Sequence, residues 1–385
     1  MHIGLNLLHP YPAMGGIWHY IARLLDAGAE PPVGHLSTAF VTTSSRALVP
    51  PSPRIRVEDL RIPGLSRSVR VLYENLVLDR QLKAHGCDLV HWFAANLGLV
   101  GTVPAVVSVY DLREYDRPGS FSLGKRLYLK MMHRHVASAA RHLLPISSTT
   151  AGQLALRFGV PDDRMTVIPP IVSDIYFDVD RQEAESYRQR RGLPGHFWLY
   201  VSDFRPYKNH AALVDAYAEL TRRCRAWPLA LRGEGALGMT ETLARARQLG
   251  VADRVRILDP VPENEMPYLY ATASALVFPS LYEGSGMPLL EAQAVGCPIL
   301  SSSIAALRES AGDAAVWMDA DDASSIAAGM ERFQADGDRR EACAGLGRRR
   351  AERWRAPVVA NLLWQAYAKA ARAAAGPDPR RGVAS

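Results

Sequence analysis

The sequence lacks the features that mark several classes of protein. Its four cysteines are scattered and form no Cys-x-x-Cys pair: Cys87, Cys224, Cys297 and Cys343. Neither a disulfide framework nor a zinc site is therefore expected. No apolar run approaches the ~18 residues of a membrane-spanning helix, and the N-terminus has no positive leader followed by a long apolar stretch. We expect a cytoplasmic protein with reduced thiols, either soluble or at the inner face of the cytoplasmic membrane.

A strong excess of one charge is also missing. The 45 Lys and Arg residues against 39 Asp and Glu residues leave a net charge of +6, with a sequence pI near 9.2. This excess favours anionic partners such as acidic lipids or phosphorylated small molecules, although on a surface this large it is equally compatible with no such partner. No basic run is interleaved with aromatic residues, so we expect no nucleic-acid binding.

Hydrophobic residues are plentiful, and they follow a regular order. They make up 48% of the 385 residues, enough for two buried cores. Short apolar segments alternate with helical patterns. The predicted strands are 2–8, 89–92, 105–109, 143–146, 165–168, 197–202, 229–232, 255–258, 275–278, 298–301 and 315–318. The predicted helices are 17–27, 68–84, 121–139, 149–158, 209–222, 240–249, 263–272 and 287–295. Such alternation predicts parallel sheets with right-handed crossovers.

A polar segment without strand periodicity, 173–195, divides this series into two halves. We predict an α/β protein of two doubly wound, Rossmann-like domains that face each other across a cleft. The domains are expected at 1–180 and 190–356. A helix at 357–375 returns to the first domain, and 376–385 is a disordered tail. In open parallel sheets ligands bind beyond the carboxyl ends of the strands, which places the site in the cleft.

The most informative stretch runs from Phe278 to Glu291. A buried strand ends at Phe278, a glycine-rich turn follows, and a helix opens near Gly286. Free amides at a helix start bind anions, and glycines let a ligand approach the backbone. Glu283 lies in the turn and Glu291 lies within about two helical turns of it. Both carboxylates can therefore address one extended ligand.

These residues resemble the signature of the retaining glycosyltransferases of the GT-B fold, family 4. The signature is a glutamate, Gly-x-Gly-x-Pro, and a second glutamate eight positions after the first; Ser285 stands where phenylalanine is usual. The resemblance implies that Glu283 contacts the donor sugar and Glu291 holds the ribose. The backbone between them would approach the sugar and phosphates: Gly284, Ser285, Gly286, Met287, Pro288 and Leu289.

A second constellation contains Arg205 and Lys208, between the predicted strand 197–202 and the helix 209–222. Cations at the carboxyl end of a strand can neutralise a diphosphate leaving group, and the family carries an Arg/Lys pair there in that role. Lys208 is the safer assignment, because the arginine register varies. The resemblance also places the backbone of Val261 beside the nucleotide base. Lys208-Asn209, which opens the predicted helix 209–222, is typical of a subgroup rich in mannosyl- and rhamnosyltransferases.

Two further matches lie in the first half. Gly15-Gly16, after the first strand, corresponds to the family's N-terminal glycine loop, where the backbone passes close to donor and acceptor. Tyr110-Asp111 follows the predicted strand 105–109. The family commonly has His-Asp there, and a tyrosine does not shuttle protons near neutral pH. Asp111 is retained as a candidate catalytic residue, together with Arg205, Lys208 and Glu283.

The resemblance implies a retaining hexosyltransferase whose donor is a nucleotide diphosphate sugar, with a GDP-mannose type favoured. A glycan or lipid-linked glycan is the expected acceptor, in bacterial surface polysaccharide synthesis. The nucleotide sugar is a substrate, and we expect neither a cofactor nor a metal. The helix 122–139 is basic and apolar, so it either rests on an anionic membrane or packs its apolar stripe inward. The departure at Tyr110 leaves open a catalytically silent nucleotide-sugar-binding protein.

Overall fold

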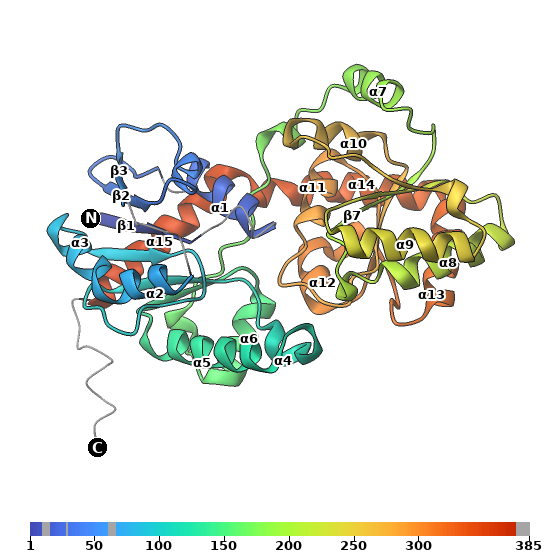
Figure 1. The fold of residues 1–385 in the computed structure, drawn as a ribbon. Coiled ribbons are helices and arrows are strands. Elements are labelled where there is room, and N and C mark those ends of the chain that lie inside the picture. Colours follow the sequence, from blue (N-terminus) through green and yellow to red (C-terminus); the bar gives the residue numbers. More distant parts are fainter. Residues whose placement is uncertain (10–15, 28–29, 61–66, 375–385) are drawn as a thin grey trace. The chain divides into compact units, whose positions relative to one another are not determined.

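The computed structural model describes residues 1–9, 16–27, 30–60 and 67–374 (Figure 1). The chain divides into two compact units. The first contains Met1–Ile171 and the chain from Ala356 onward, and the second contains Val172–Arg355. None of the described helices combines the length and the apolar character needed to cross a bilayer.

The first unit is built on a parallel sheet with the order β3-β2-β1-β4-β5-β6. Its strands are β1 (His2–Leu7), β2 (Leu36–Val41), β3 (Ile55–Asp59), β4 (Leu89–Trp92), β5 (Ala105–Val109) and β6 (His142–Pro145). Its helices are α1 (Gly16–Ala27), α2 (Arg67–Leu76), α3 (Leu78–Ala84), α4 (Arg113–Asp116), α5 (Leu123–Ala139), α6 (Ser148–Phe158) and α15 (Ala356–Ala374).

The second unit repeats this plan with the order β12-β11-β10-β7-β8-β9. Its strands are β7 (Trp198–Val201), β8 (Leu229–Arg232), β9 (Val255–Ile257), β10 (Ala275–Phe278), β11 (Ile299–Ser302) and β12 (Ala315–Met318). Its helices are α7 (Arg181–Arg190), α8 (His210–Arg223), α9 (Ala236–Gln248), α10 (Met266–Thr272), α11 (Met287–Val295), α12 (Ala305–Ala311), α13 (Ala323–Ala335) and α14 (Gly337–Ala351).

The predicted fold class, two parallel α/β sheets with flanking helices, is confirmed. Several elements differ in detail. The strands β2 and β3 were not predicted, and the predicted strand 165–168 reduces to one bridge, between Leu143 and Met165. The predicted helix 68–84 is two helices that meet at Val77. The polar segment 173–195 contains α7, which buries Ala184 and Tyr187 within the second unit.

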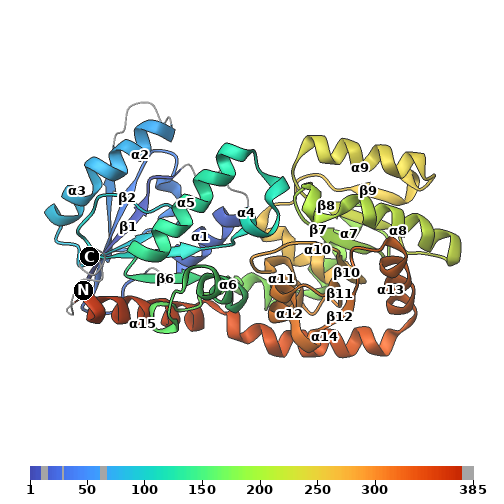
Figure 2. The same cartoon turned by 90° about the horizontal axis from the view of Figure 1, so that it is seen from below.

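The helix α15 is tied to the sheet of the first unit by a buried histidine of β4. His91 contacts the hydroxyl of Tyr367 through Nδ1 (2.7 Å) and the hydroxyl of Ser108 through Nε2 (2.9 Å). Its ring also lies 3.8 Å from that of Phe93, centroid to centroid. Burial lowers the pKa of His91 to about 3, so the ring is neutral in the folded protein. Figure 2 shows α15 running along this unit. The predicted tail 376–385 lies outside the described residues.

Candidate functional site

The strand order of the second sheet reverses between β7 and β10. From β7 the chain proceeds to β8 and β9 on one side, then crosses back to β10, β11 and β12 on the other. At such a point the loops that leave the two strands diverge, and open parallel sheets bind their ligands in that crevice. The two predicted constellations are the loops that follow these strands, after Val201 and after Phe278.

The loop after β7 is held rigidly. Asn209 adopts a left-handed conformation (φ 66°), and its side-chain amide donates to the carbonyls of Pro279 (3.3 Å) and Ala320 (2.7 Å). The hydroxyl of Tyr200 donates to the carbonyl of Lys208 (2.6 Å). These bonds fix the backbone from which the Lys208 side chain extends.

Lys208 and Glu283 form an ion pair at this reversal point. Lys208 Nζ lies 2.6 Å from Glu283 Oε1, and the two side chains are only 15% and 14% exposed. The loops also bond through their backbones, since the Leu281 amide donates to the Tyr207 carbonyl (2.9 Å). The structure therefore brings the two predicted constellations together, although they lie 75 residues apart in the chain.

The glycine-rich turn is sterically tight at Gly286. A Cβ atom there would lie 2.7 Å from Cδ2 of Leu307, so a larger residue would force the buried Leu307 side chain of α12 to shift. Gly284, Ser285 and Met287 are partly exposed beside it. Leu289 donates its amide to the Gly286 carbonyl (2.8 Å) and Pro288 has no N–H. Within this predicted donor-binding stretch, neither Leu289 nor Pro288 therefore offers an amide to a ligand.

Glu291 is buried in α11, with 6% of its surface exposed. Its Oε2 accepts a hydrogen bond from the hydroxyl of Tyr270 in α10 (2.9 Å). Burial, together with the neighbouring carboxylate, raises the pKa of Tyr270 well above its ordinary value. Tyr270 therefore stays protonated and acts as a donor, which fixes the orientation of the Glu291 carboxylate.

The side chain of Arg205 and the backbone of Val261, two other predicted site residues of the second unit, make contacts of their own. Arg205 belongs to the same loop as Lys208, but its Nε pairs with Asp203 (3.7 Å) and its side chain is 49% exposed. Val261 is buried after β9, and its carbonyl accepts a hydrogen bond from Arg232 Nη2 (3.4 Å).

In the first unit, Gly16 opens α1 and Gly15 lies outside the described residues. Tyr110 and Asp111 follow β5. The Tyr110 hydroxyl donates to the carbonyl of Phe93, and its ring meets that of Tyr20 edge-on. Asp111 Oδ1 accepts from the Arg113 amide at the start of α4 (3.0 Å). The tyrosine at the expected histidine position is thus bonded to backbone.

One carboxylate in each of two Asp-x-Asp motifs makes hydrogen bonds within the protein. The chain contains Asp-x-Asp at 178–180 and 319–321. Asp180 caps α7 by accepting from the amides of Gln182 and Glu183, and Asp319 Oδ1 accepts from the Asp321 amide (3.0 Å). In the described part of the chain, no three His, Cys, Asp or Glu residues gather as a metal site would require.

Two family models match the chain, one in each half. "Glycosyltransferase Family 4" matches residues 14–174 and "Glycosyl transferases group 1" matches residues 183–350. The chain belongs to glycosyltransferase family 4. The predicted resemblance to GT-B glycosyltransferases of family 4 is confirmed.

Relatives of this glycosyltransferase include two curated enzymes. O-antigen chain mannosyltransferase B of Escherichia coli is 28% identical over 63% of this chain and 64% of its own length. D-inositol 3-phosphate glycosyltransferase of Salinispora arenicola is 29% identical over 76% of this chain and 70% of its own length. Among solved structures, Anabaena HepE in complex with UDP-glucose is similar with a TM-score of 0.75 and 16% identity, covering 96% of this chain and 99% of that one.

Sequence reasoning missed several residues that shape the candidate site. Tyr270 and Asn209 act through contacts across the sheet edge, and nothing in the local sequence specifies those contacts. Gly233 and Gly235 did carry a signal, because Gly-Glu-Gly directly follows a strand. A Cβ at Gly233 would lie 1.8 Å from the Ser202 carbonyl oxygen, and Gly235 has φ +117°. These glycines let the loop after β8 pack on the loop after β7.

Proposed function

We propose that this glycosyltransferase moves a hexose from a nucleotide diphosphate sugar, preferably of the GDP-mannose type, to a glycan or lipid-linked glycan in bacterial surface polysaccharide synthesis. The Lys208–Glu283 pair carries the proposal, because it places a cation and a carboxylate at the ligand-binding point of the sheet. The O-antigen mannosyltransferase relative supports the mannose-type donor and the polysaccharide product. The HepE complex with UDP-glucose supports a nucleotide sugar as the donor class.

Each proposed contact matches a chemical need of the donor. The ammonium of Lys208 compensates the diphosphate charge, and Glu283, released from that lysine, accepts from hydroxyls of the sugar. The carboxylate of Glu291 accepts from the ribose hydroxyls, in the orientation that Tyr270 imposes. Arg205, which is exposed on the same loop, reaches the diphosphate from solvent. Met287 and the glycines of the turn approach the phosphates.

We propose that the reaction retains the anomeric configuration. The sugar–phosphate bond breaks, positive charge grows on the anomeric carbon, and the diphosphate leaves with the electron pair. The acceptor hydroxyl attacks from the same face, and the leaving phosphate takes its proton. Lys208 stabilises the charge on the leaving group throughout. In this scheme a lysine neutralises the diphosphate, so we propose a metal-independent reaction that needs no cofactor.

We further propose that the protein works at the inner face of the cytoplasmic membrane, through α5. Three apolar side chains of this helix are more than half exposed: Leu123, Leu127 and Met131. The inward face of the helix is a different one, formed by Met132, His133, Val136 and Ala137. An exposed apolar stripe flanked by basic residues binds anionic bilayers. Flotation with acidic vesicles tests this point, and absence of binding would reject it.

A catalytically silent nucleotide-sugar-binding protein is the second candidate. Tyr110 favours it, because its hydroxyl is bonded to the Phe93 carbonyl and supplies no proton acceptor. Such a protein would bind the donor without transfer and without slow donor hydrolysis.

A thermal-shift panel of GDP-, UDP-, dTDP- and ADP-sugars tests the proposed donor. A ligand present at about 100 times its Kd stabilises the fold by about 2.7 kcal/mol, and GDP-mannose should produce the largest shift. Release of GDP in the presence of acceptor separates the enzyme from the silent binder. If none of the four donor classes shifts the melting temperature, the proposed function is wrong.

A further inference from the structure

Exposed apolar side chains gather on one region of the first unit, around α2 and α5. The helix α2 contributes Val69, Leu72 and Leu76, and α5 contributes Leu123, Leu127 and Met131. Leu99 and Val100, which follow β4, are about two-thirds exposed as well. Clusters of exposed apolar side chains are typical of binding surfaces.

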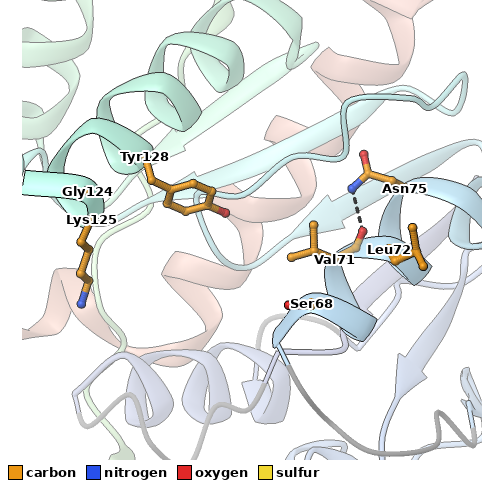
Figure 3. A pocket seen from close by; sticks show the side chains of 7 residues that line it. All are labelled: Ser68, Val71, Leu72, Asn75, Gly124, Lys125 and Tyr128. Atoms are coloured by element: carbon orange, nitrogen blue, oxygen red, sulfur yellow. Dashed lines mark hydrogen bonds between the residues drawn. The ribbon is translucent and has the colours of Figure 1, made fainter.

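A pocket of about 650 Å³ opens between these two helices (Figure 3). It is lined by Ser68, Val71, Leu72 and Asn75 of α2, and by Gly124, Lys125 and Tyr128 of α5. Figure 3 shows Tyr128 pointing from α5 toward α2. The volume lies in the range of small-molecule sites, about 300–1,000 Å³.

Much of the pocket lining is hydrocarbon, and the side-chain amide among its lining residues is already bonded. Asn75 Nδ2 donates to the Val71 carbonyl (2.7 Å), and Asn75 Oδ1 accepts from the Leu99 amide (2.6 Å). Val71, Leu72 and the Tyr128 ring supply hydrocarbon surface around it. A hydrocarbon ligand would thus leave both of these Asn75 hydrogen bonds in place.

The one charged side chain among the residues that line the pocket is positive. Lys125 lines the pocket and is exposed, and α5 also carries Arg126, Lys130 and Arg134 but no Asp or Glu. The single acid of α2, Glu74, points inward, where Arg70 and Asn6 bond its carboxylate. A ligand that joins a hydrocarbon chain to a phosphate matches both the apolar interior and the basic edge.

We infer that the pocket between α2 and α5 binds the hydrocarbon chain of a lipid-phosphate-linked acceptor, with Lys125 beside its phosphate. The inference rests on the proposed function and specifies its acceptor. It differs from general membrane contact, because one chain would leave the bilayer and enter a pocket on the protein.

Gly124 allows the pocket to be filled without disturbing the fold. A Cβ atom at Gly124 meets nothing within 4 Å, and the same is true of Gly152, an exposed glycine of α6 in the same unit. Gly124→Phe therefore places a ring in the pocket, and Gly152→Phe is the matched control. Lys125→Gln removes the charge and leaves the pocket open.

The probes are dodecyl phosphate below its micelle concentration, dodecanol and inorganic phosphate, measured by calorimetry on the full chain. We expect dodecyl phosphate to bind and inorganic phosphate not to bind. Gly124→Phe should weaken dodecyl phosphate binding at least tenfold, whereas Gly152→Phe should leave it unchanged. Lys125→Gln should weaken binding of dodecyl phosphate and not that of dodecanol.

Three results would overturn the inference. The first is no binding of dodecyl phosphate by the wild type. The second is an unchanged affinity in Gly124→Phe, or an equal loss in Gly152→Phe. The third is a parallel loss of flotation with phosphatidylglycerol vesicles in Gly124→Phe, which would assign the pocket to bulk lipid. The melting-temperature shift caused by GDP-mannose is measured on every variant. Its absence in the wild type would count against the proposed function, whereas dodecyl phosphate binding tests the proposed role of the pocket.

Discussion

Lys208→Ala removes one half of the ion pair that joins the loops after β7 and β10. The wild-type pair has a 2.6 Å separation and side chains only 15% and 14% exposed. Breaking a fully buried pair costs about 3–5 kcal/mol, and an exposed pair contributes about 0–1 kcal/mol. For this largely buried pair we expect a loss of about 2 kcal/mol, or a fall of about 4–8 °C in the melting temperature of a unit of this size.

The effect on donor binding is separate from this loss of stability. For the wild type, GDP at about 100 times its Kd adds about 2.7 kcal/mol, a rise of roughly 5–10 °C. In Lys208→Ala the diphosphate meets an unpaired Glu283 instead of a cation. We therefore expect no measurable GDP shift in scanning calorimetry.

The double variant Lys208→Ala/Glu283→Gln distinguishes the two effects. It no longer holds an unpaired carboxylate, so about 1 kcal/mol or more of the lost stability should return. Donor binding should not return, because the cation is still missing. A wild-type GDP shift in Lys208→Ala would refute the reasoning, since the pair would then serve stability alone.

Three further substitutions test other contacts. Tyr270→Phe removes the hydroxyl that orients Glu291 (2.9 Å), so GDP should bind about tenfold more weakly in calorimetry. Gly233→Ala places a Cβ against the Ser202 carbonyl, and denaturant unfolding should show a loss of about 2–3 kcal/mol. His91 has a folded pKa of about 3 against 6.5 for the free side chain, so its contribution is complete above pH 6.5 and is lost as the pH falls. As the pH is lowered from about 6 to 4, the free energy of unfolding should therefore decrease less steeply in His91→Gln than in the wild type. The difference between the two slopes should be about 1.4 kcal/mol per pH unit.

Matched controls accompany these variants. Tyr268→Phe changes the same residue type on the same helix, α10, and should leave GDP affinity as in the wild type. Gly152→Ala adds a Cβ where nothing lies within 4 Å, so stability should be unchanged or rise by up to about 1 kcal/mol. If a variant and its control changed GDP affinity or stability equally, the contact named for that variant would not be the cause of the change.

The local features of the fold and of the site were predictable, because they depend on neighbours in the chain. Short buried strands of a parallel sheet are continuous apolar runs, as in Ala275–Phe278 and Trp198–Val201. The spacing from Glu283 to Glu291 spans one turn and the start of one helix, so it limits how far apart they can lie. By contrast, β2 and β3 were missed because Ser37, Thr38 and the charged residues of Ile55–Asp59 interrupt the apolar pattern.

The contacts across the sheet edge depend on strand order, which local sequence does not encode. Lys208 meets Glu283 because β7 and β10 are neighbours where the order reverses. Tyr270 likewise reaches Glu291 from another helix. The break between α2 and α3 has a similar origin, since Asp79 of α3 accepts from the amides of Thr102 (2.7 Å) and Val103 (3.0 Å), in the segment before β5. The helical periodicity of the sequence continues through the break at Val77, because periodicity indicates only which face of a helix is apolar. The direction of each helix depends instead on the hydrogen bonds of Asp79 to the segment before β5.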